Sequence, residues 1–336
     1  MRNLNLPKVV FGTSGLGNLY VELSVQTKCD IVKACVSHSE KPVFFDSAGK
    51  YGAGLALESL GQCLTMLDVN PADVMISNKL GWFRTELTTP EPTFEPGIWR
   101  NLKHDAVQRI GYDEILACYE QGNQLLKNYK AQMVSVHDPD EYLAGAGNEG
   151  EQSQRYQKIL DAYRALNELK EKGEVKAVGV GSKDWKIIKR ITDDVKLDWV
   201  MIANSMTLHS HPADLVLFME KLRQDGVIII NSAVFNSGFL IGSDYYNYQL
   251  MDPEVNKELY KWRKDFFELC DHHGVTPAEA CVGFGLTAPG VKSIALNTTN
   301  AERVKKNVLM ALKQIPEGFW TDMKNQGLID SQYHFV

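Results

Sequence analysis

The chain has 336 residues, of which 44% are hydrophobic and 23% charged, with a formal net charge of −6 at pH 7. This length permits one large domain or two ordinary ones. The acidic balance argues against a nucleic-acid partner, because such binding depends on neutralising phosphates. No apolar run is long enough to span a bilayer, and the first residues lack a signal-peptide pattern, so we expect no membrane partner and a cytoplasmic location. The six cysteines are scattered without a CxxC pair, which predicts free buried thiols and no metal site.

Short apolar runs alternate with helix-length segments along the chain. Runs of this kind are typical of buried parallel strands. They lie at 9–12, 43–47, 73–79, 132–137, 176–181, 199–204, 226–233 and 291–296. Helix-like stretches between them include 53–67, 112–129, 154–172, 213–225 and 276–288. The alternation, with no linker, predicts a (β/α)8 TIM barrel that forms a single domain over residues 1–336.

Three segments that follow strands are longer than usual strand-to-helix connections: 80–111, 138–153 and 234–262. They are expected on the face formed by the carboxyl ends of the strands, where barrel active sites lie. The stretches 82–100 and 239–250 are rich in aromatic residues. Such side chains can stack on a sugar or a nicotinamide ring, although they can also simply cover the barrel rim.

The glycine-rich sequence GTSGLG at 12–17 follows the first strand, and Asp46 ends the second. This combination is similar to the dinucleotide-binding fingerprint of doubly wound folds. The spacing is wrong, however, because a motif read from Gly15 has Tyr20 in place of its third glycine. The glycines instead predict a tight turn at which the backbone closely approaches a ligand.

Four polar residues stand at or just after the ends of three predicted strands: Asp46, Tyr51, Lys79 and His137. Each has an ordinary explanation alone, such as a helix cap, a loop lysine, a packing tyrosine or a buried histidine. Together they are expected to converge, because the carboxyl ends of barrel strands surround one pocket.

This set of side chains suits proton transfer to or from a carbonyl oxygen. A free tyrosine has a pKa of about 10, so Tyr51 needs neighbours that favour the phenolate. The ammonium of Lys79 is expected to lower the pKa of Tyr51, while Asp46 keeps Lys79 charged. His137 would donate a hydrogen bond to the substrate oxygen and orient it.

The four residues and their spacing resemble the aldo-keto reductase family. The segments that carry the resemblance are FGTSGLGNLY, FDSAGKYGAGLALESLG, SNKLGW, VSVHDPD, ELKEKGEVKAVGVGSKDW, NSAVFNSGFL and SIALNTTNAERVKKNV, from residue 11 to about 308. Within the family, GLGNLY, HDPD and FNSG are most similar to the sugar 1-dehydrogenases, which include L-fucose and D-threo-aldose 1-dehydrogenases. The resemblance implies a catalytic tetrad of Asp46, Tyr51, Lys79 and His137, and NAD or NADP bound in extended form.

The resemblance also implies a cofactor site. Its residues would be Gly12, Thr13, Asp46, Ser182, Asn204, Ser232, Asn236, Gly238, Leu240, Ser293, Asn297, Thr298, Thr299, Arg303 and Asn307. Asn297 stands where NADPH-preferring members often carry a lysine, which favours NAD, while Arg303 leaves NADP open. Ser232 replaces the tyrosine that commonly stacks on the nicotinamide, and Ser182 and Asn204 take the carboxamide positions.

The sequence therefore predicts an oxidoreductase that converts an aldose to its lactone, with a small sugar or carbonyl compound as its partner and no metal. One alternative is an NADPH-dependent reductase of small aldehydes or ketones with the same tetrad. Another is a nucleotide-binding regulatory subunit with little turnover, like the potassium-channel β-subunits of this fold. The oligomeric state and the sugar are not encoded in any feature that we recognise.

Overall fold

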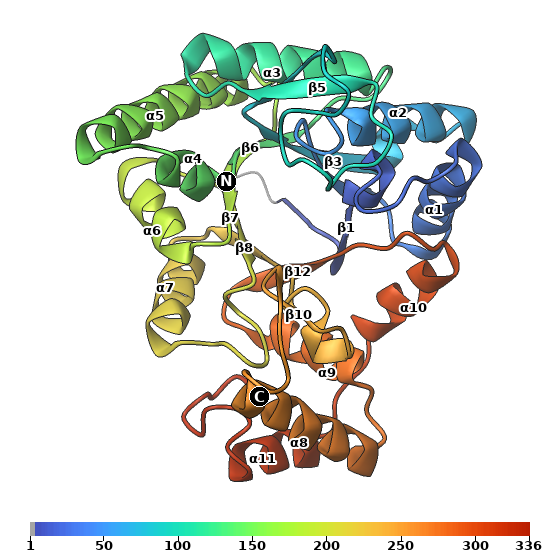
Figure 1. The fold of residues 1–336 in the computed structure, drawn as a ribbon, viewed down its shortest axis with the longest axis vertical. Coiled ribbons are helices and arrows are strands. Elements are labelled where there is room, and N and C mark those ends of the chain that lie inside the picture. The colour runs from blue at the N-terminus through green and yellow to red at the C-terminus, as the bar shows by residue number, and fades with distance from the viewer. Residues whose placement is uncertain (1–3) are drawn as a thin grey trace.

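The computed structural model describes residues 4–336, and strands from this part of the chain form a closed barrel (Figure 1). Neighbouring barrel strands are parallel throughout and follow the order β1-β12-β9-β8-β7-β6-β3-β2. Their bounds are β1 Val9–Gly12, β2 Val43–Ala48, β3 Val74–Leu80, β6 Met133–His137, β7 Ala177–Ser182, β8 Trp199–Ala203, β9 Ile228–Ser232 and β12 Val291–Leu296. The predicted (β/α)8 barrel is confirmed, and each predicted strand matches an observed one to within two residues at its ends.

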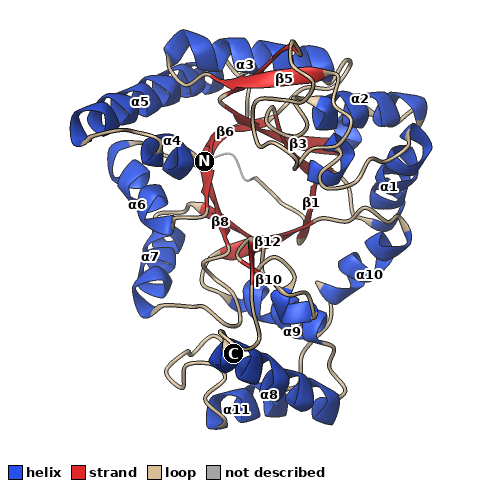
Figure 2. Cartoon of the chain, in the orientation of Figure 1, coloured by secondary structure: helices blue, strands red, loops and turns tan. Residues whose placement is uncertain are grey.

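Helices surround the ring of strands (Figure 2). They are α1 Val25–His38, α2 Leu55–Met66, α3 Tyr112–Leu125, α4 Pro139–Ala144, α5 Glu149–Glu171, α6 Trp185–Asp194, α7 Ala213–Gln224, α8 Lys257–His273, α9 Pro277–Thr287, α10 Glu302–Met310 and α11 Glu317–Asn325. Local sequence explains where α9 begins. At α9, Thr276 and Glu279 form a capping box around Pro277, which suits a first helical position. Within residues 4–336, no helix has the length and apolarity needed to cross a membrane.

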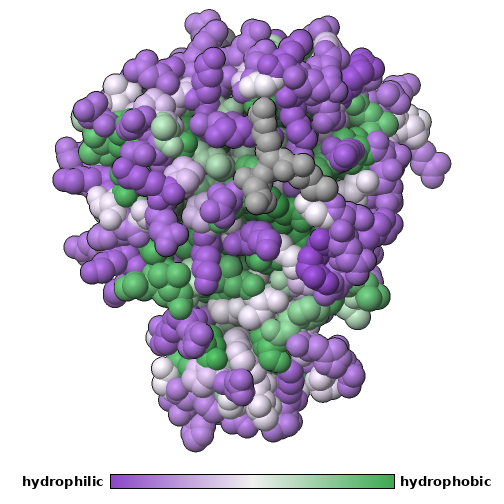
Figure 3. All heavy atoms as spheres, turned by 180° about the vertical axis from the view of Figure 1, so that it is seen from behind, coloured by the Kyte–Doolittle hydropathy of each residue, from purple (hydrophilic) through white to green (hydrophobic). Residues whose placement is uncertain are grey.

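The core has two layers because strand side chains alternate between the faces of the sheet. Inside the barrel, one cluster joins Phe44 with Val10, Met75, Met133, Trp199 and Ile230. Val43 and Phe45 point outward and pack in the cluster that includes side chains of α1 and α2. Seen from behind, the molecule is largely hydrophilic around its periphery, with apolar atoms visible toward the middle (Figure 3).

The long segments on the catalytic face contain structure of their own. Within 80–111, β4 Trp82–Glu86 pairs with β5 His104–Gln108 as an antiparallel hairpin. Within 234–262, β10 Tyr245–Tyr246 pairs with β11 Gln249–Leu250. Short 3-10 helices occur at η1 Ser14–Gly17, η2 Pro71–Asp73 and η3 Phe239–Ile241. These additions are absent from the ideal barrel repeat, so its periodicity does not predict them.

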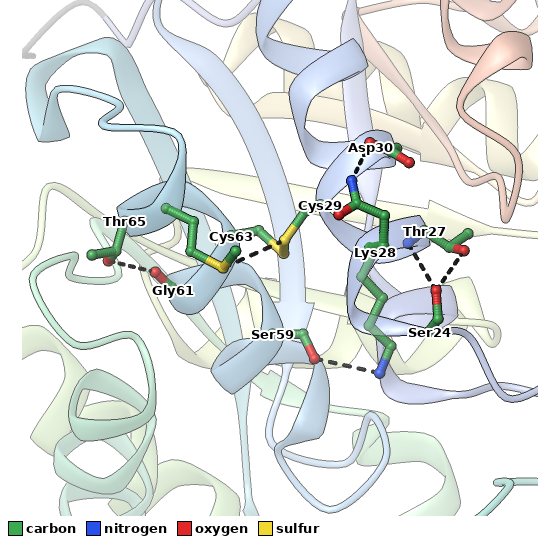
Figure 4. The surroundings of a disulfide bond; sticks show 11 residues. Ser24, Thr27, Lys28, Cys29, Asp30, Ser59, Gly61, Cys63 and Thr65 are labelled. Atoms are coloured by element: carbon green, nitrogen blue, oxygen red, sulfur yellow. Dashed lines mark hydrogen bonds between the residues drawn. A yellow bond between two sulfur atoms is a disulfide. The ribbon is translucent and has the colours of Figure 1, made fainter.

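The prediction of six free thiols was wrong for one pair. Cys29 on α1 and Cys63 on α2 form a disulfide, with their Cα atoms 4.9 Å apart (Figure 4). Lys28 also reaches across the two helices, with Nζ 3.5 Å from Ser59 Oγ. The other four cysteines are free and buried, as expected. The pairing depends on how α1 packs against α2, which cysteine spacing alone does not reveal.

Candidate active site

Strand alternation explains why three polar side chains meet inside the barrel. On β2, Phe44 points into the barrel, so Asp46, two residues later, points the same way. Lys79 lies four residues after Met75 on β3, and His137 four residues after Met133 on β6, so each also points into the barrel. All three polar residues lie near the carboxyl ends of their strands and are buried.

Tyr51 lies in the turn between β2 and α2, and close backbone packing fixes its position. A Cβ on Gly17 would lie 2.8 Å from the carbonyl carbon and oxygen of Tyr51. Gly52 has φ +60°, and a Cβ there would approach Gly17 O to 2.3 Å. The glycine-rich turn after β1 therefore allows close contact with the Tyr51 backbone. The predicted role of these glycines was close approach to a ligand, and this packing role of Gly17 was not predicted.

The structure brings the four predicted residues together. Lys79 and Asp46 form a buried ion pair, and Ser77 Oγ donates a 2.6 Å hydrogen bond to the other carboxylate oxygen of Asp46. Lys79 Nζ lies 4.7 Å from the centre of the Tyr51 ring. The rings of Tyr51 and His137 are 5.6 Å apart and meet edge to face. One phenol, one ammonium and one imidazole thus adjoin a single point at the barrel mouth.

Burial dominates the electrostatics of these groups. It raises the pKa of Tyr51 to about 12, although the charge of Lys79 acts in the opposite direction. Burial also favours a neutral Lys79, but Asp46 and Tyr51 outweigh it and raise the pKa of the ammonium. Burial, assisted by Lys79, Lys50 and Lys183, lowers the pKa of His137 well below its usual value. At neutral pH the site therefore holds a protonated tyrosine, a charged lysine and a neutral histidine.

Residues after β1 and β12 that were predicted to bind the cofactor lie beside one another. Asn297 Nδ2 donates a 2.7 Å hydrogen bond to Ser14 Oγ, and a Cβ on Gly12 would lie 3.4 Å from that of Asn297. Thr13 Oγ1 donates to the backbone oxygen of Asp46 at 3.0 Å, which connects this region to the tetrad. Thr298 and Thr299 belong to the same loop, and a Cβ on Gly15 would lie 3.1 Å from Thr299 Cγ2.

The ends of β7, β8 and β9 form the other side of the mouth. Asn236 Nδ2 donates to Asn247 Oδ1 at 2.8 Å and lies 3.4 Å from the backbone oxygen of Asn204. Ser232 Oγ donates to Ile202 O, and Ser182 Oγ exchanges hydrogen bonds with the Asp184 backbone.

Backbone conformation also stands out in these loops. Asn204 and Asn236 have φ values of +59° and +45°, and Gly238 has +92°. Left-handed backbone at non-glycine residues often accompanies binding loops.

Four other predicted cofactor residues lie in different surroundings. Ser293 is buried on β12 and donates to Pro7 O, two residues before β1 begins. That contact lies toward the amino ends of the strands, so the structure does not bring Ser293 to the tetrad. Leu240 has a fully buried side chain, and its backbone N–H donates to the backbone oxygen of Phe235 at 3.2 Å. Arg303 and Asn307 lie on α10, where Arg303 is exposed.

A charged cluster lies beside Tyr51, and it was not predicted from the sequence. Lys50 is only 5% exposed, and its Nζ lies 2.8 Å from Glu95 and 2.9 Å from Glu141. Burial favours a neutral Lys50, but Asp138, Glu95 and Glu141 outweigh it and raise its pKa. Lys183 also pairs with Glu141. These residues come from four segments that are far apart in the sequence, so no local motif reveals the cluster.

The cluster also positions an aromatic wall. Glu95 accepts a 2.7 Å hydrogen bond from the Trp99 indole, and the Trp99 ring lies 5.9 Å from that of Tyr51. Lys50 Nζ lies 5.4 Å from the centre of the Trp82 ring. The indole N–H of Trp82 is buried and has no hydrogen-bond partner among residues 4–336. Two aromatic rings therefore adjoin the site, from the segment in which sequence analysis predicted aromatic contacts.

Comparison with known proteins identifies the family. The model of the aldo/keto reductase family matches residues 8–325. The chain belongs to this family. It is 26% identical to a pyridoxal 4-dehydrogenase of Microbacterium luteolum over 341 residues, covering 97% of this chain and 95% of the relative. It is 24% identical to a D-threo-aldose 1-dehydrogenase of a Pseudomonas species over 339 residues, with the same shares covered.

A solved structure shares the aldo/keto reductase fold. The holo form of an aldo-keto reductase from Bacillus halodurans superposes with a TM-score of 0.67 at 17% identity, covering 98% of this chain and 95% of that one. The predicted family is thus confirmed. The protein is an oxidoreductase of the aldo/keto reductase family, whose members use NAD(P)H.

Proposed function

We propose that this protein oxidises an aldose at C1 to its lactone, with NAD or NADP as the hydride acceptor. The observation that carries the proposal is the grouping of Tyr51, Lys79 and His137 beside an aromatic wall. Trp82 and Trp99 belong to an apolar cluster that adjoins Tyr51, and aromatic rings of this kind can pack against sugar rings. The likeness to a D-threo-aldose 1-dehydrogenase supports a sugar as the substrate.

In this proposal each side chain of the tetrad has a separate role in the transfer of the C1 hydroxyl proton. His137, kept neutral by burial, donates a hydrogen bond to the C1 oxygen and orients it. Tyr51 accepts the hydroxyl proton as C1 is oxidised, and Lys79 stabilises the phenolate that this requires. Asp46 holds the ammonium of Lys79 in place within the barrel. The nicotinamide, when bound, supplies the redox chemistry.

The residues around the mouth fit such a cofactor. Asn204 Oδ1 is buried without a hydrogen-bond partner among residues 4–336, so it can accept from a carboxamide N–H. Ser182 is buried at the end of neighbouring β7 and offers a hydroxyl. Asn236 and Gly238 would follow the pyrophosphate, and Arg303 offers an exposed charge for the adenosine end. The neutral Asn297 favours NAD over NADP in this proposal.

A second candidate function uses the same tetrad in the opposite direction, to reduce small aldehydes or ketones. It is favoured by the pKa of about 12 for Tyr51, because a protonated phenol is ready to donate a proton to a carbonyl oxygen.

A substrate and cofactor panel separates the two functions. Purified protein would be given aldoses such as D-arabinose and L-fucose with NAD or NADP, and small aldehydes with NADH or NADPH. Reduced-cofactor absorbance reports turnover, and mass spectrometry identifies the lactone. We expect aldose oxidation, with NAD used at least as well as NADP. Aldehyde reduction without any aldose oxidation would reject the proposal in favour of the reductase.

A further inference from the structure

A carboxylate beside the tetrad has charged neighbours but no hydrogen-bond donor among residues 4–336. Asp138 directly follows His137, and its Oδ2 lies 3.4 Å from His137 Nε2 and 3.6 Å from Lys50 Nζ. Both distances exceed those of ordinary hydrogen bonds between such groups. Among residues 4–336, the carboxylate accepts no hydrogen bond, although its side chain is only 16% exposed.

The usual structural roles do not account for this side chain. Asp138 precedes the first turn of α4, where an aspartate commonly caps the helix, but its side chain makes no capping hydrogen bond. Its backbone is also left-handed, with φ +43° and ψ +57°. A buried carboxylate without donors is unfavourable, and burial accordingly raises its pKa to about 6. Strain and desolvation together at an active site indicate a group held for a ligand.

The surrounding charges restrict what that ligand can be. Lys50 and Lys183 face Asp138, but so do Glu141 and Asp140, and Glu95 also pairs with Lys50. Both lysines are therefore already neutralised by carboxylates. A substrate that carries its own anionic group would meet repulsion here, whereas a neutral hydroxyl would supply the donor that Asp138 lacks.

We propose that Asp138 is a specificity-determining residue that accepts a hydrogen bond from a hydroxyl on the carbon next to the one that is oxidised or reduced. This inference rests on the proposed role of His137, which places the reacting oxygen at Nε2. Because Asp138 Oδ2 lies beside that nitrogen, a hydroxyl one carbon away reaches it. The site therefore selects α-hydroxy carbonyl compounds and the sugars derived from them, and disfavours their deoxy counterparts.

The test compares matched substrates that differ in this hydroxyl. D-arabinose and 2-deoxy-D-ribose form the pair for oxidation, since the second is the first without its C2 hydroxyl. Lactaldehyde and propanal form the pair for reduction, since propanal is lactaldehyde without its C2 hydroxyl. The ratio of kcat/KM within each pair would be measured for wild type and for Asp138→Gly, which removes the carboxylate and suits the left-handed backbone. The control is Asp140→Asn on α4, whose carboxylate binds the Asp184 backbone.

We expect wild type and Asp140→Asn to prefer the hydroxylated substrate, and Asp138→Gly to lose about 10- to 100-fold of that preference, as for a hydrogen bond to a charged group. A second variant, Asp138→Asn, keeps the side-chain shape and should lose less, because its amide oxygen still accepts. An unchanged ratio in both Asp138 variants would overturn the inference. A protein that reduces aldehydes but oxidises no aldose would reject the proposed function alone, because the lactaldehyde and propanal pair still tests Asp138.

Discussion

For the single residue Tyr51, the balance between burial and the charge of Lys79 sets the pKa of the hydroxyl. Sequence analysis predicted that Lys79 would lower the pKa of Tyr51, and the charge does act in that direction. It could not predict that desolvation outweighs the charge, because the depth of a side chain depends on the packed barrel. The tyrosine is therefore protonated at rest, and oxidation should accelerate as pH rises.

Lys79→Met should raise the pH at which the rate of oxidation increases. Without the ammonium, nothing opposes the desolvation of the phenolate, so the pKa of Tyr51 rises further. The measurement is the pH dependence of kcat for wild type, Lys79→Met and Lys79→Arg, and the arginine variant should shift less.

The Lys79 substitution also leaves Asp46 buried without its partner, which can cost about 3–5 kcal/mol of stability. The double variant Asp46→Asn/Lys79→Met removes both charges and checks that the shift in pH does not reflect unfolding. If the rate of oxidation rises at the same pH in folded variants as in wild type, Lys79 does not lower the pKa of Tyr51.

At the scale of elements, the sequence predicts the barrel repeat well and the additions to it poorly. Apolar runs define strands such as β2 and β6 because both faces of each strand are buried. The same reasoning predicted the strand positions of Asp46, Lys79 and His137. It missed the β4–β5 hairpin and the ion pairs of Lys50, because those depend on contacts between distant loops.

The bond between α1 and α2 gives a prediction at this scale. Four of the six cysteines should react with a thiol reagent after unfolding without reductant, and all six after reduction. Cys63→Ser should lower the free energy of unfolding by about 2–4 kcal/mol, because it frees a loop that the bond closes. Cys35→Ala on α1 is the control that leaves the bond intact. Six reactive thiols without reductant would contradict the disulfide.

At the scale of the whole molecule, one barrel supplies both the proton-transfer groups and the surface for a dinucleotide. The observed topology excludes a doubly wound sheet, so the glycines after β1 do not belong to a Rossmann fingerprint. Instead, the loops after β1 and β12 meet on one side of the mouth, and the ends of β7, β8 and β9 face it from the other. This division implies that cofactor binding and proton transfer can be separated by mutation.

Tyr51→Phe removes the one hydroxyl that is assigned to exchange the substrate proton. Single-turnover reduction of NAD by an aldose, and the affinity for NAD alone, would be measured for wild type and variant. We predict that hydride transfer slows by about 10²- to 10⁴-fold while the affinity for NAD stays nearly unchanged, since Tyr51 acts on substrate. Hydride transfer that stays within about tenfold of the wild-type rate would contradict the assignment of Tyr51 as the acid and base.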